Sequence, residues 1–442
     1  MRDLARSDDA RVQAQLDRLA GLSVPQGRLS LAPIRALLDR LGNPQRDLPP
    51  VFHVAGTNGK GSTCAFLRAI IEADDKTVHQ FTSPHLVRYN ERIRLAGCLI
   101  EDDLLAALLE EVLDRCGDIP ASFFEVTTAT AFLAFARSPA DATIVEVGLG
   151  GRFDATNVLE HPACCGIAAL GLDHEAFLLV PEPGTPQLPI ARIAFEKAGI
   201  IKPGVPIVTV AHDRAEAVRQ IEHASALAGA PLHVQGADWT IAGATPVEYA
   251  DRHGQLTLPP PALPGSHQLA NAGLAIAMLR HQDFLTVSPS AFAQGLRNVS
   301  WPARLQWLAQ GPLTQRAGPL QILLDGGHNP AAAAALANYL ATIKVPVHAI
   351  IGMLSSKDAV GFITTIASHL SSLTAVPISG HDHHVPQDLC TIAAELACEV
   401  QDDIHSAIDS IAARAAANDV ILVCGSLYLA GEVLHANRQL PS

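Results

Sequence analysis

A glycine-rich segment with a single lysine, residues 51–63 (VFHVAGTNGKGST), contains the residue types that bind phosphate. It predicts a buried strand and then a turn, where glycine lets successive backbone N–H groups point at phosphate oxygens. Lys60 adds a positive charge, and a helix expected over residues 61–73 adds the positive end of its dipole. The strict P-loop pattern is not met, because Val54 replaces its first glycine and Gly61 separates Lys60 from Ser62. Loose matches of this kind are common, so the rest of the chain has to support phosphate binding.

A carboxylate that is expected to be buried follows in residues 144–157 (IVEVGLGGRFDATN). Glu146 lies inside an apolar, strand-like run, and an isolated buried charge is costly. A metal ion or another cation beside it would remove that cost. Arg152, Asp154 and Asn157 then follow in one loop after a Gly-Leu-Gly-Gly turn. A purely structural role explains this set of polar residues poorly.

Three further segments place polar side chains after apolar runs, and each also has a structural explanation. Ser83 lies in the sequence TSPH, which a proline turn accounts for. His174, in GLDHE, is either a metal ligand or a hydrogen-bonded structural histidine. Lys197, in FEKAGII, would ordinarily be a solvated residue on a helix.

The segment LLDGGHNP, residues 323–330, begins with the last residues of another expected strand. Asn329 and Pro330 are typical of the N-cap and first turn of a helix. That capping role leaves Asp325 and His328 unexplained, so both are candidates for ligand contact.

Composition limits the possible classes of protein. The 442 residues are too many for one core, which predicts two domains, and 48% are hydrophobic against 17% charged. The net charge of −13 argues against nucleic-acid binding. The eight cysteines form no CxxC pair, and the sequence has no signal peptide and no apolar stretch long enough to span a membrane. We therefore expect a cytoplasmic protein whose cysteines are reduced, with Cys164 and Cys165 buried in a strand.

Apolar runs that alternate with helical patterns predict an α/β fold with parallel sheets. In the first part we expect strands over residues 51–56, 143–148, 166–172 and 205–210, and an amphipathic helix over residues 101–115. After residue 301 we expect strands over 320–325, 347–352, 373–378 and 420–424, and helices over 331–342, 358–370 and 404–417. The predicted domains are residues 1–300 and 301–442. Ligands of such folds bind at the carboxyl ends of the strands, here between the domains.

Taken together, the motifs resemble one family. GTNGKGS, TSPHLVRYNER, EVGLGGRFDATN, LDH, EKAGI, HQ-x-x-N-A and DGGHNP occur in the order found in folylpolyglutamate synthases and dihydrofolate synthases, which belong to the Mur-ligase superfamily. The resemblance extends from about residue 27 to residue 430. It implies an N-terminal P-loop-type ATPase domain and a C-terminal Rossmann-like α/β domain. The short segment before Gly56 favours the folate branch of the superfamily.

The resemblance also implies roles for individual residues. Lys60, Lys197, His174 and Arg304 match the catalytic positions, and Lys197 matches a lysine that is carbamylated in this family. The residues implied to bind ATP are Gly56, Thr57, Asn58, Gly59, Lys60, Gly61, Ser62, Asn271, Arg304 and Asp325. The implied ligands of two Mg²⁺ ions are Ser83, Glu146, His174 and carbamylated Lys197. The implied pterin-binding residues are Arg28, Leu29, Ser30, Ser122, Phe123, Phe124, Glu125, Phe153, Asp154 and Ala155. His328 and Ser426 are candidates for glutamate binding.

The implied reaction is ATP-dependent addition of L-glutamate to dihydropteroate and to reduced folates through an acyl phosphate, by a monomer that binds neither nucleic acid nor membranes. Arg28 stands where the family has an aspartate beside the pterin, which keeps open a folylpolyglutamate synthase without the first activity. A nucleotide-binding regulatory protein is a third alternative. It predicts loss of Glu146, His174 or Lys197, but all three are present. Residues 178–189 (LLVPEPGTPQLP) resemble an insertion and predict a stiff surface loop.

Overall fold

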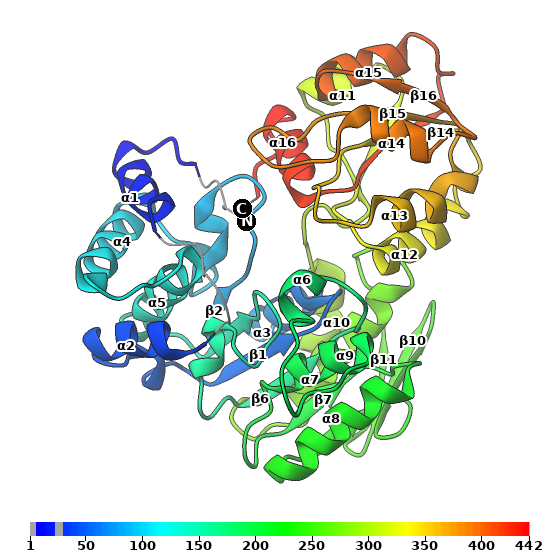
Figure 1. The fold of residues 1–442 in the computed structure, drawn as a ribbon. Helices are drawn as coiled ribbons and strands as arrows, with labels where there is room; N and C mark the ends of the chain where they lie inside the picture. The colour runs from blue at the N-terminus through cyan, green and yellow to red at the C-terminus, as the bar shows by residue number, and fades with distance from the viewer. Residues whose placement is uncertain (1–5, 23–29, 442) are drawn as a thin grey trace. The chain divides into compact units, whose positions relative to one another are not determined.

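The computed structural model describes residues 6–22 and 30–441, which divide into two compact units (Figure 1). The first unit contains the described residues up to Ala262 together with Gln268–Ser300. The second unit contains Trp301–Pro441 and also the short piece Leu263–His267, which we did not expect there. Within the described residues, no helix is both long enough and apolar enough to cross a membrane.

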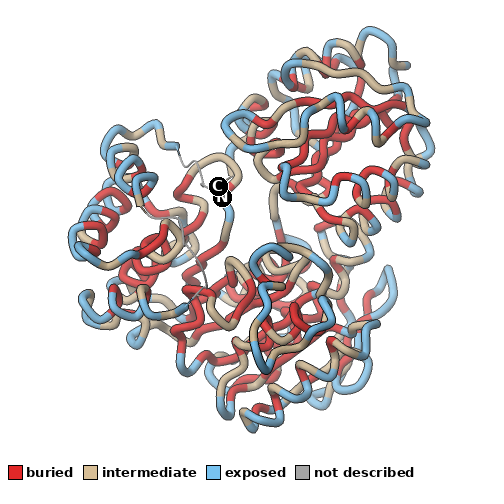
Figure 2. Tube along the Cα trace, in the orientation of Figure 1, coloured by how far each residue is buried: buried red, intermediate tan, exposed pale blue. Residues whose placement is uncertain are grey.

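The first unit is built on an eight-stranded sheet with the order β4-β3-β2-β5-β1-β6-β7-β8. The strands β2, β5, β1, β6, β7 and β8 run parallel to one another. At one edge, β3 pairs antiparallel with β2, and β4 pairs antiparallel with β3. The strands are β1 (Val51–Ala55), β2 (Val78–Phe81), β3 (Ile93–Leu95), β4 (Cys98–Leu99), β5 (Ala142–Glu146), β6 (Cys164–Ile167), β7 (Ile207–Thr209) and β8 (Leu232–Val234). Every residue of β1, β2, β5 and β6 is buried, as strands covered on both faces must be (Figure 2).

Helices cover this sheet in two groups. One core joins residues of α1, α2, α4 and α5 to β1, β2 and β5, and another joins residues of α7 and α8 to β6 and β7. The helices of this unit are α1 (Ala10–Ala20), α2 (Ala32–Arg40), α3 (Lys60–Glu72), α4 (Asp102–Cys116), α5 (Phe123–Ala136), α6 (Glu175–Leu178), α7 (Pro189–Ala198), α8 (Ala215–Ala228), α9 (His267–Arg280) and α10 (Pro289–Asn298), with 3₁₀ turns η1 (Pro44–Arg46), η2 (Tyr89–Arg92) and η3 (Ala155–Val158). The amphipathic helix expected over residues 101–115 is confirmed as α4.

The expected strand over residues 166–172 is wrong, because β6 ends at Ile167. The neighbouring strand β1 ends opposite it, at Ala55. Beyond that point the carbonyl of Ala169 accepts hydrogen bonds from the backbone N–H groups of Thr57 and Asn58. The backbone after β6 therefore binds the glycine-rich loop instead of continuing the sheet.

A small antiparallel sheet was not expected. It consists of β9 (Trp239–Gly243), β10 (Val247–Asp251) and β11 (Gly254–Leu258). Its strands have one exposed face, with Trp239 and Tyr249 stacked on the buried face at 6.2 Å between ring centroids. Such strands contain no continuous apolar run, which explains why the sequence pattern did not indicate them.

The second unit is built on a six-stranded sheet with the order β12-β13-β17-β14-β15-β16, in which only the pair β12 and β13 is antiparallel. The strands are β12 (Gln306–Trp307), β13 (Gln321–Leu324), β14 (Val347–Ile351), β15 (Ser372–Ala375), β16 (Ala397–Val400) and β17 (Val420–Cys424). The helices are α11 (Pro312–Ala317), α12 (Pro330–Leu340), α13 (Ala359–Ile366), α14 (Pro386–Ile392), α15 (Ile404–Ala412) and α16 (Leu427–Ala436), with the 3₁₀ turn η4 (Ala367–His369). The two-domain α/β fold expected from the sequence is confirmed.

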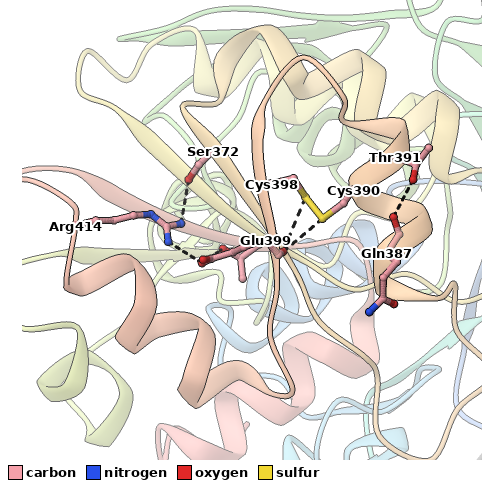
Figure 3. Close-up of a disulfide and its surroundings, with 8 residues drawn as sticks. Ser372, Gln387, Cys390, Thr391, Cys398, Glu399 and Arg414 are labelled. Carbon is pink, nitrogen blue, oxygen red and sulfur yellow. Dashed lines mark hydrogen bonds and ion pairs between the residues drawn. A yellow bond between two sulfur atoms is a disulfide. The ribbon is translucent and has the colours of Figure 1, made fainter.

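The expectation that all cysteines are reduced is wrong, because Cys390 of α14 and Cys398 of the edge strand β16 form a disulfide (Figure 3). Their Cα atoms are 5.5 Å apart. Both sulfur atoms face the backbone carbonyl of Glu399, whose carboxylate pairs with Arg414 at 2.7 Å (Figure 3). The two cysteines meet because α14 packs against β16, a spatial relation that a CxxC search does not detect. The expected burial of Cys164 and Cys165 in β6 is confirmed.

Three histidines meet where β8, the small sheet and the end of α9 come together. The rings of His233 and His281 stack with centroids 3.9 Å apart, and His253 lies edge-on to His281 at 5.2 Å. Asp251 lies 3.5 Å from His281, but Arg280 binds both of its carboxylate oxygens at 2.7 Å. Burial, followed by the adjacent His233, lowers the pKa of His281 to about 4.

This cluster should make the first unit sensitive to acid. A histidine whose folded pKa lies below its unfolded value of about 6.5 makes the unfolded chain bind more protons, so stability falls as the pH decreases from about 6.5 toward 4. We expect His281→Gln to reduce the loss of unfolding free energy between pH 7 and pH 5 by about 1 kcal/mol. Urea unfolding at both pH values measures this difference. His223→Gln, at an exposed position of α8, is the control, and equal pH dependence in the two variants would contradict the prediction.

Candidate active site

The glycine-rich loop after β1 forms the tightly packed start of α3. Gly59 has a φ of +86° and caps the helix, which begins at Lys60, one residue earlier than expected. A Cβ atom at Gly59 would lie 2.3 Å from Oδ1 of Asn271, and one at Gly56 would lie 2.9 Å from Cβ of Ala168. Glycine is therefore required at both positions, and Asn271 of α9 lies directly against the loop.

Hydrogen bonds join this loop to the segment that carries His174. The side-chain oxygen of Thr57 donates to the carbonyl of Gly171 at 2.9 Å and accepts from the N–H of Gly171 at 3.1 Å. His174 follows in a left-handed conformation, with a φ of +54°, and its N–H donates to the carboxylate of Asp173 at 2.8 Å. The structure thus brings the loop and the histidine segment to the same edge of the sheet.

Glu146 and Ser83 meet at the carboxyl ends of two neighbouring parallel strands. Glu146 is the last residue of β5, and Ser83 comes two residues after β2. The N–H of Ser83 donates to the Glu146 carboxylate at 3.3 Å, and Glu146 is only 5% exposed. The structure confirms the expected burial of this carboxylate.

Lys197 is not a solvated surface residue. It is 4% exposed on α7, and its Nζ atom donates to the carbonyl of Gly56 at 2.9 Å. Burial and the charge of Lys60 lower its pKa to about 7, against the opposing effects of Asp173 and Asp154. Its amine is consequently present in both protonation states near neutral pH.

The loop after β5 packs against the end of α7, next to Lys197. The N–H of Arg152 donates to the carbonyl of Glu196 at 2.7 Å, and a Cβ atom at Gly199 would lie 2.5 Å from Cα of Arg152. The side chain of Asn157 donates to the carbonyls of Arg152 and Gly199 at 3.0 Å each. Asn157 therefore has a structural role in holding this loop to the helix.

Asp154 is buried in the same loop. Its carboxylate accepts hydrogen bonds from the N–H groups of Leu149 at 2.8 Å and Thr156 at 3.0 Å. Burial raises its pKa, and these hydrogen bonds oppose the rise. The next residue, Ala155, is also buried and begins η3.

Aromatic side chains lie beside this loop. The ring of Phe124 lies on Gly148, where a Cβ atom would be 2.4 Å from its Cζ atom. Ser122 and Glu125 form the capping box of α5, so their polar atoms hydrogen-bond each other. Phe153 lies under the guanidinium of Arg152, at 4.2 Å from ring centroid to Cζ.

The other residues predicted to bind the pterin lie at the start of α5 and in the segment before α2. Phe123 is partly buried at the start of α5 and packs edge-on against Tyr89 at 6.0 Å. Ser30 is exposed, whereas Arg28 and Leu29 lie outside the described residues.

In the second unit, Asp325 organises the loop after β13. Its two carboxylate oxygens accept hydrogen bonds from the N–H groups of Leu305 at 3.0 Å and Gly327 at 2.8 Å. Arg304 lies against the same loop, because a Cβ atom at Gly326 would be 2.8 Å from its guanidinium. The structure thus brings Arg304 and Asp325 together.

His328 and Ser426 lie on neighbouring connections of this unit. The N–H of Gly425 donates to the carbonyl of Gly327 at 3.1 Å, which joins the loop after β17 to the loop after β13. Ser426 accepts from the N–H of Tyr428 at 3.1 Å as the N-cap of α16. Nδ1 of His328 lies 3.0 Å from the carbonyl of Gly326.

Comparison with known proteins decides the family. A family model described as the C-terminal domain of dihydrofolate synthetase matches residues 312–436. The dihydrofolate synthase/folylpolyglutamate synthase of Escherichia coli K12 is 32% identical over 411 residues, which cover 92% of this chain and 90% of that protein. The chain belongs to the dihydrofolate synthase/folylpolyglutamate synthase family. The resemblance noted in the sequence is therefore confirmed.

Solved structures of this family have the same fold. E. coli FolC in complex with DHPP and ADP superposes with a TM-score of 0.85 at 32% identity and covers 96% of this chain and 97% of its own. A bifunctional folylpolyglutamate synthase/dihydrofolate synthase with Mn, AMPPNP and L-glutamate bound has a TM-score of 0.84 at 32% identity, with coverage of 96% and 97%.

The structure also shows neighbours that the sequence did not single out. Gln268, 1% exposed, accepts a hydrogen bond from the Asn271 side chain at 3.0 Å, and its own Nε2 atom has no partner among the described residues. Its presence in the family motif HQ-x-x-N-A was the available signal, because these two residues lie on one face of α9. Asp173, next to His174, was likewise not singled out although it influences Lys197.

Within residues 6–22 and 30–441, no group of three or more His, Cys, Asp or Glu side chains could hold a metal ion. The ligand set implied by the family contains only two such residues, Glu146 and His174, together with Ser83 and a modified Lys197. The implied set therefore stays a prediction.

The fit between Gly59 and Asn271 can be tested with one substitution and a matched control. We expect Gly59→Ala to weaken the predicted binding of ATP by about tenfold, or about 1.4 kcal/mol, because the added methyl group must displace Asn271. Gly42 has a similar φ of +83° but no atom within 4 Å of its Cβ position, so Gly42→Ala introduces the same backbone strain without the clash. Calorimetric titration with ATP compares the two variants. Equal affinities would show that the contact with Asn271 does not shape the loop.

Proposed function

We propose that this protein is an ATP-dependent ligase that adds L-glutamate to dihydropteroate, forming dihydrofolate, and to reduced folates, forming folylpolyglutamates. The observation that carries the proposal is the contact between Lys197 and the carbonyl of Gly56. It joins a buried, readily deprotonated lysine to a glycine-rich loop of the kind that binds phosphate. Membership of the family supplies the substrates, since its members are named for these two reactions.

In the proposed reaction, a carboxylate oxygen of the folate substrate attacks the γ-phosphorus of ATP. A new O–P bond forms while the bond to the β–γ bridging oxygen breaks, which releases ADP and leaves an acyl phosphate. The amine of L-glutamate then attacks the acyl carbon and loses a proton, and inorganic phosphate leaves as the amide forms. Phosphoryl transfer of this kind depends on positioning and charge stabilisation, so no nucleophilic side chain is required.

The first unit supplies the groups for phosphate binding. The N-terminus of α3 and the ammonium group of Lys60 would neutralise the charge of the triphosphate. Asn271 would hold the loop in its binding conformation from the side of α9. From the family motifs, we also assign Arg304 and Asp325 to contacts with the nucleotide, and His328 and Ser426 to contacts with glutamate.

The residues around Glu146 fit a hard divalent cation. A buried carboxylate beside a serine provides the oxygen donors that Mg²⁺ prefers, and a cation there would offset the cost of burying the charge. We propose that Ser83, Glu146, His174 and carbamylated Lys197 hold two Mg²⁺ ions. When bound, Mg²⁺ stabilises the charge that develops on the transferred phosphoryl group. A related structure holds Mn together with AMPPNP and L-glutamate, which supports a role for a divalent metal in the proposed reaction.

Lys197 has the properties that carbamylation requires. Only the neutral amine adds to CO₂, forming an N–C bond and releasing a proton, and a pKa of about 7 keeps much of the amine neutral at physiological pH. The product is a carboxylate, which converts a cation into an oxygen ligand. The monomeric, cytoplasmic form expected from the sequence stays a prediction.

Replacement of Lys197 tests this role. We expect Lys197→Ala to lower the rate of glutamate addition by about a hundredfold or more while leaving the fold intact, because the metal ions lose the ligand that organises them. ADP release and the mass of the product measure the activity, and circular dichroism measures the fold. Lys202→Ala is the matched control, since Lys202 is partly buried and also donates to a backbone carbonyl, that of Asn157 rather than that of Gly56. Full activity of Lys197→Ala would refute the metal-organising role.

The two acceptor activities can be separated in one assay. We expect the purified protein to release ADP from ATP with magnesium and L-glutamate when either dihydropteroate or a reduced folate monoglutamate is added, with glutamylated products detected by mass spectrometry. Release with the folate alone would leave the alternative, a folylpolyglutamate synthase only, with Arg28 as the first residue to replace. Release with neither acceptor would contradict the ligase assignment.

A further inference from the structure

The chain between His174 and Lys197 contains one residue that connects a surface loop to the candidate active site. Residues 179–188 join α6 to α7 and are largely exposed, as expected for a proline-rich loop. Within this loop, the side chain of Glu182 is only 14% exposed. Thr185 closes the turn around it by donating from its hydroxyl to the carbonyl of Glu182 at 2.7 Å.

Glu182 takes part in a four-residue ion-pair network. Its carboxylate accepts from Arg152 at 3.2 Å, with a second, shorter contact to the same guanidinium, and from Arg192 at 3.1 Å. Glu196 binds the same two arginines, at 2.8 Å from Arg152 and 2.9 Å from Arg192. Each arginine therefore lies between two carboxylates.

The two arginines and two glutamates of this network carry equal and opposite charge, and their side chains are largely shielded from solvent. The side chains of Arg192 and Glu196 are 7% and 6% exposed, and that of Arg152 is 22% exposed. The guanidinium of Arg152 also lies over the rings of Phe153 and Phe195, at 4.2 and 4.9 Å. Without Glu182, the buried guanidinium of Arg192 and the partly buried guanidinium of Arg152 would share one carboxylate, and their mutual repulsion would move at least one of them.

The network ends next to Lys197. Arg152 binds Glu196 twice, through its guanidinium and through the hydrogen bond from its N–H to the Glu196 carbonyl. Glu196 is the residue before Lys197 on α7, and the Lys197 amine lies 2.9 Å from the Gly56 carbonyl. A shift of Arg152 would therefore move the turn of α7 that sets the position of the Lys197 amine.

We propose that Glu182, contributed by the loop of residues 179–188, is a positioning residue that holds Arg152 against α7 and thereby fixes Lys197 beside the phosphate-binding loop. The proposal rests on the proposed ligase function and assigns a role to a segment that the family motifs do not include. Glu182 acts through Arg152 and Glu196 and does not itself touch the reacting groups.

The test is Glu182→Gln, which keeps the size of the side chain and removes its charge. We expect kcat for glutamate addition to fall about tenfold, with the KM for ATP unchanged within about twofold, because Lys60 and the glycine-rich loop are not altered. Glu182→Asp restores the carboxylate and should recover most of the activity. Glu111→Gln is the matched control, since Glu111 of α4 makes a two-point ion pair with Arg137, the residue that follows the C-terminus of α5, and neither residue belongs to the Glu182 network.

A second measurement does not depend on turnover. Protein incubated with ¹³C-bicarbonate in the absence of ATP should give a carbamate signal by NMR that Lys197→Ala eliminates. We expect this signal to weaken in Glu182→Gln and to stay unchanged in Glu111→Gln.

The outcomes separate this proposal from the proposed function. Wild-type kcat and a wild-type carbamate signal in Glu182→Gln would overturn the positioning role while leaving the ligase function intact. An equal loss of kcat in Glu182→Gln and Glu111→Gln would show a general loss of stability and would also overturn it. If the wild-type protein releases no ADP with either acceptor, the ligase function fails, and the carbamate signal alone then decides the role of Glu182.

Discussion

The burial of the Lys197 amine against the backbone of the glycine-rich loop is the contact on which the candidate site depends. A lysine that is 4% exposed would be strongly destabilising as an unpaired cation. Here the Gly56 carbonyl accepts its hydrogen bond, Asp154 and Asp173 contribute opposite charge, and its pKa of about 7 allows it to lose the proton. The end of α7 has to approach the glycine-rich loop closely for these conditions to hold together.

The close approach of α7 to the loops at this edge of the sheet explains why several positions there are occupied by glycine. A Cβ atom at Gly151 would lie 2.7 Å from the carbonyl oxygen of Glu196, and one at Gly199 would lie 2.5 Å from Arg152. The loop after β5 and the end of α7 can therefore pack backbone to backbone only because neither position carries a side chain. Glycine at position 148 likewise makes room for the ring of Phe124. The glycine-rich sequence EVGLGG is thus explained by close packing as much as by conformational freedom.

The sequence predicted β1 and β5 of the first sheet and β14 and β17 of the second, because strands buried on both faces contain continuous apolar runs. It missed β2, although every residue of that strand is buried, because its sequence VHQF contains two polar residues. It did not indicate β9–β11 or β16, whose exposed faces interrupt that pattern. The motifs located Lys60, Glu146 and Lys197, but contacts between distant segments had no sequence signal. The disulfide between Cys390 and Cys398 and the ion pairs of Glu182 both arise only when separate elements pack together.

The distribution of charge around Lys197 explains how a chain with a net charge of −13 can attract a triphosphate. Arg152 and Arg192 contribute two positive charges nearby, but Glu182 and Glu196 neutralise both. These arginines therefore hold α7 in place without competing for phosphate. Within the first unit, Lys60 and the N-terminus of α3 then remain to attract phosphate. Pairing the arginines internally thus separates the groups that position Lys197 from the groups that bind phosphate, although they lie within one short stretch of structure.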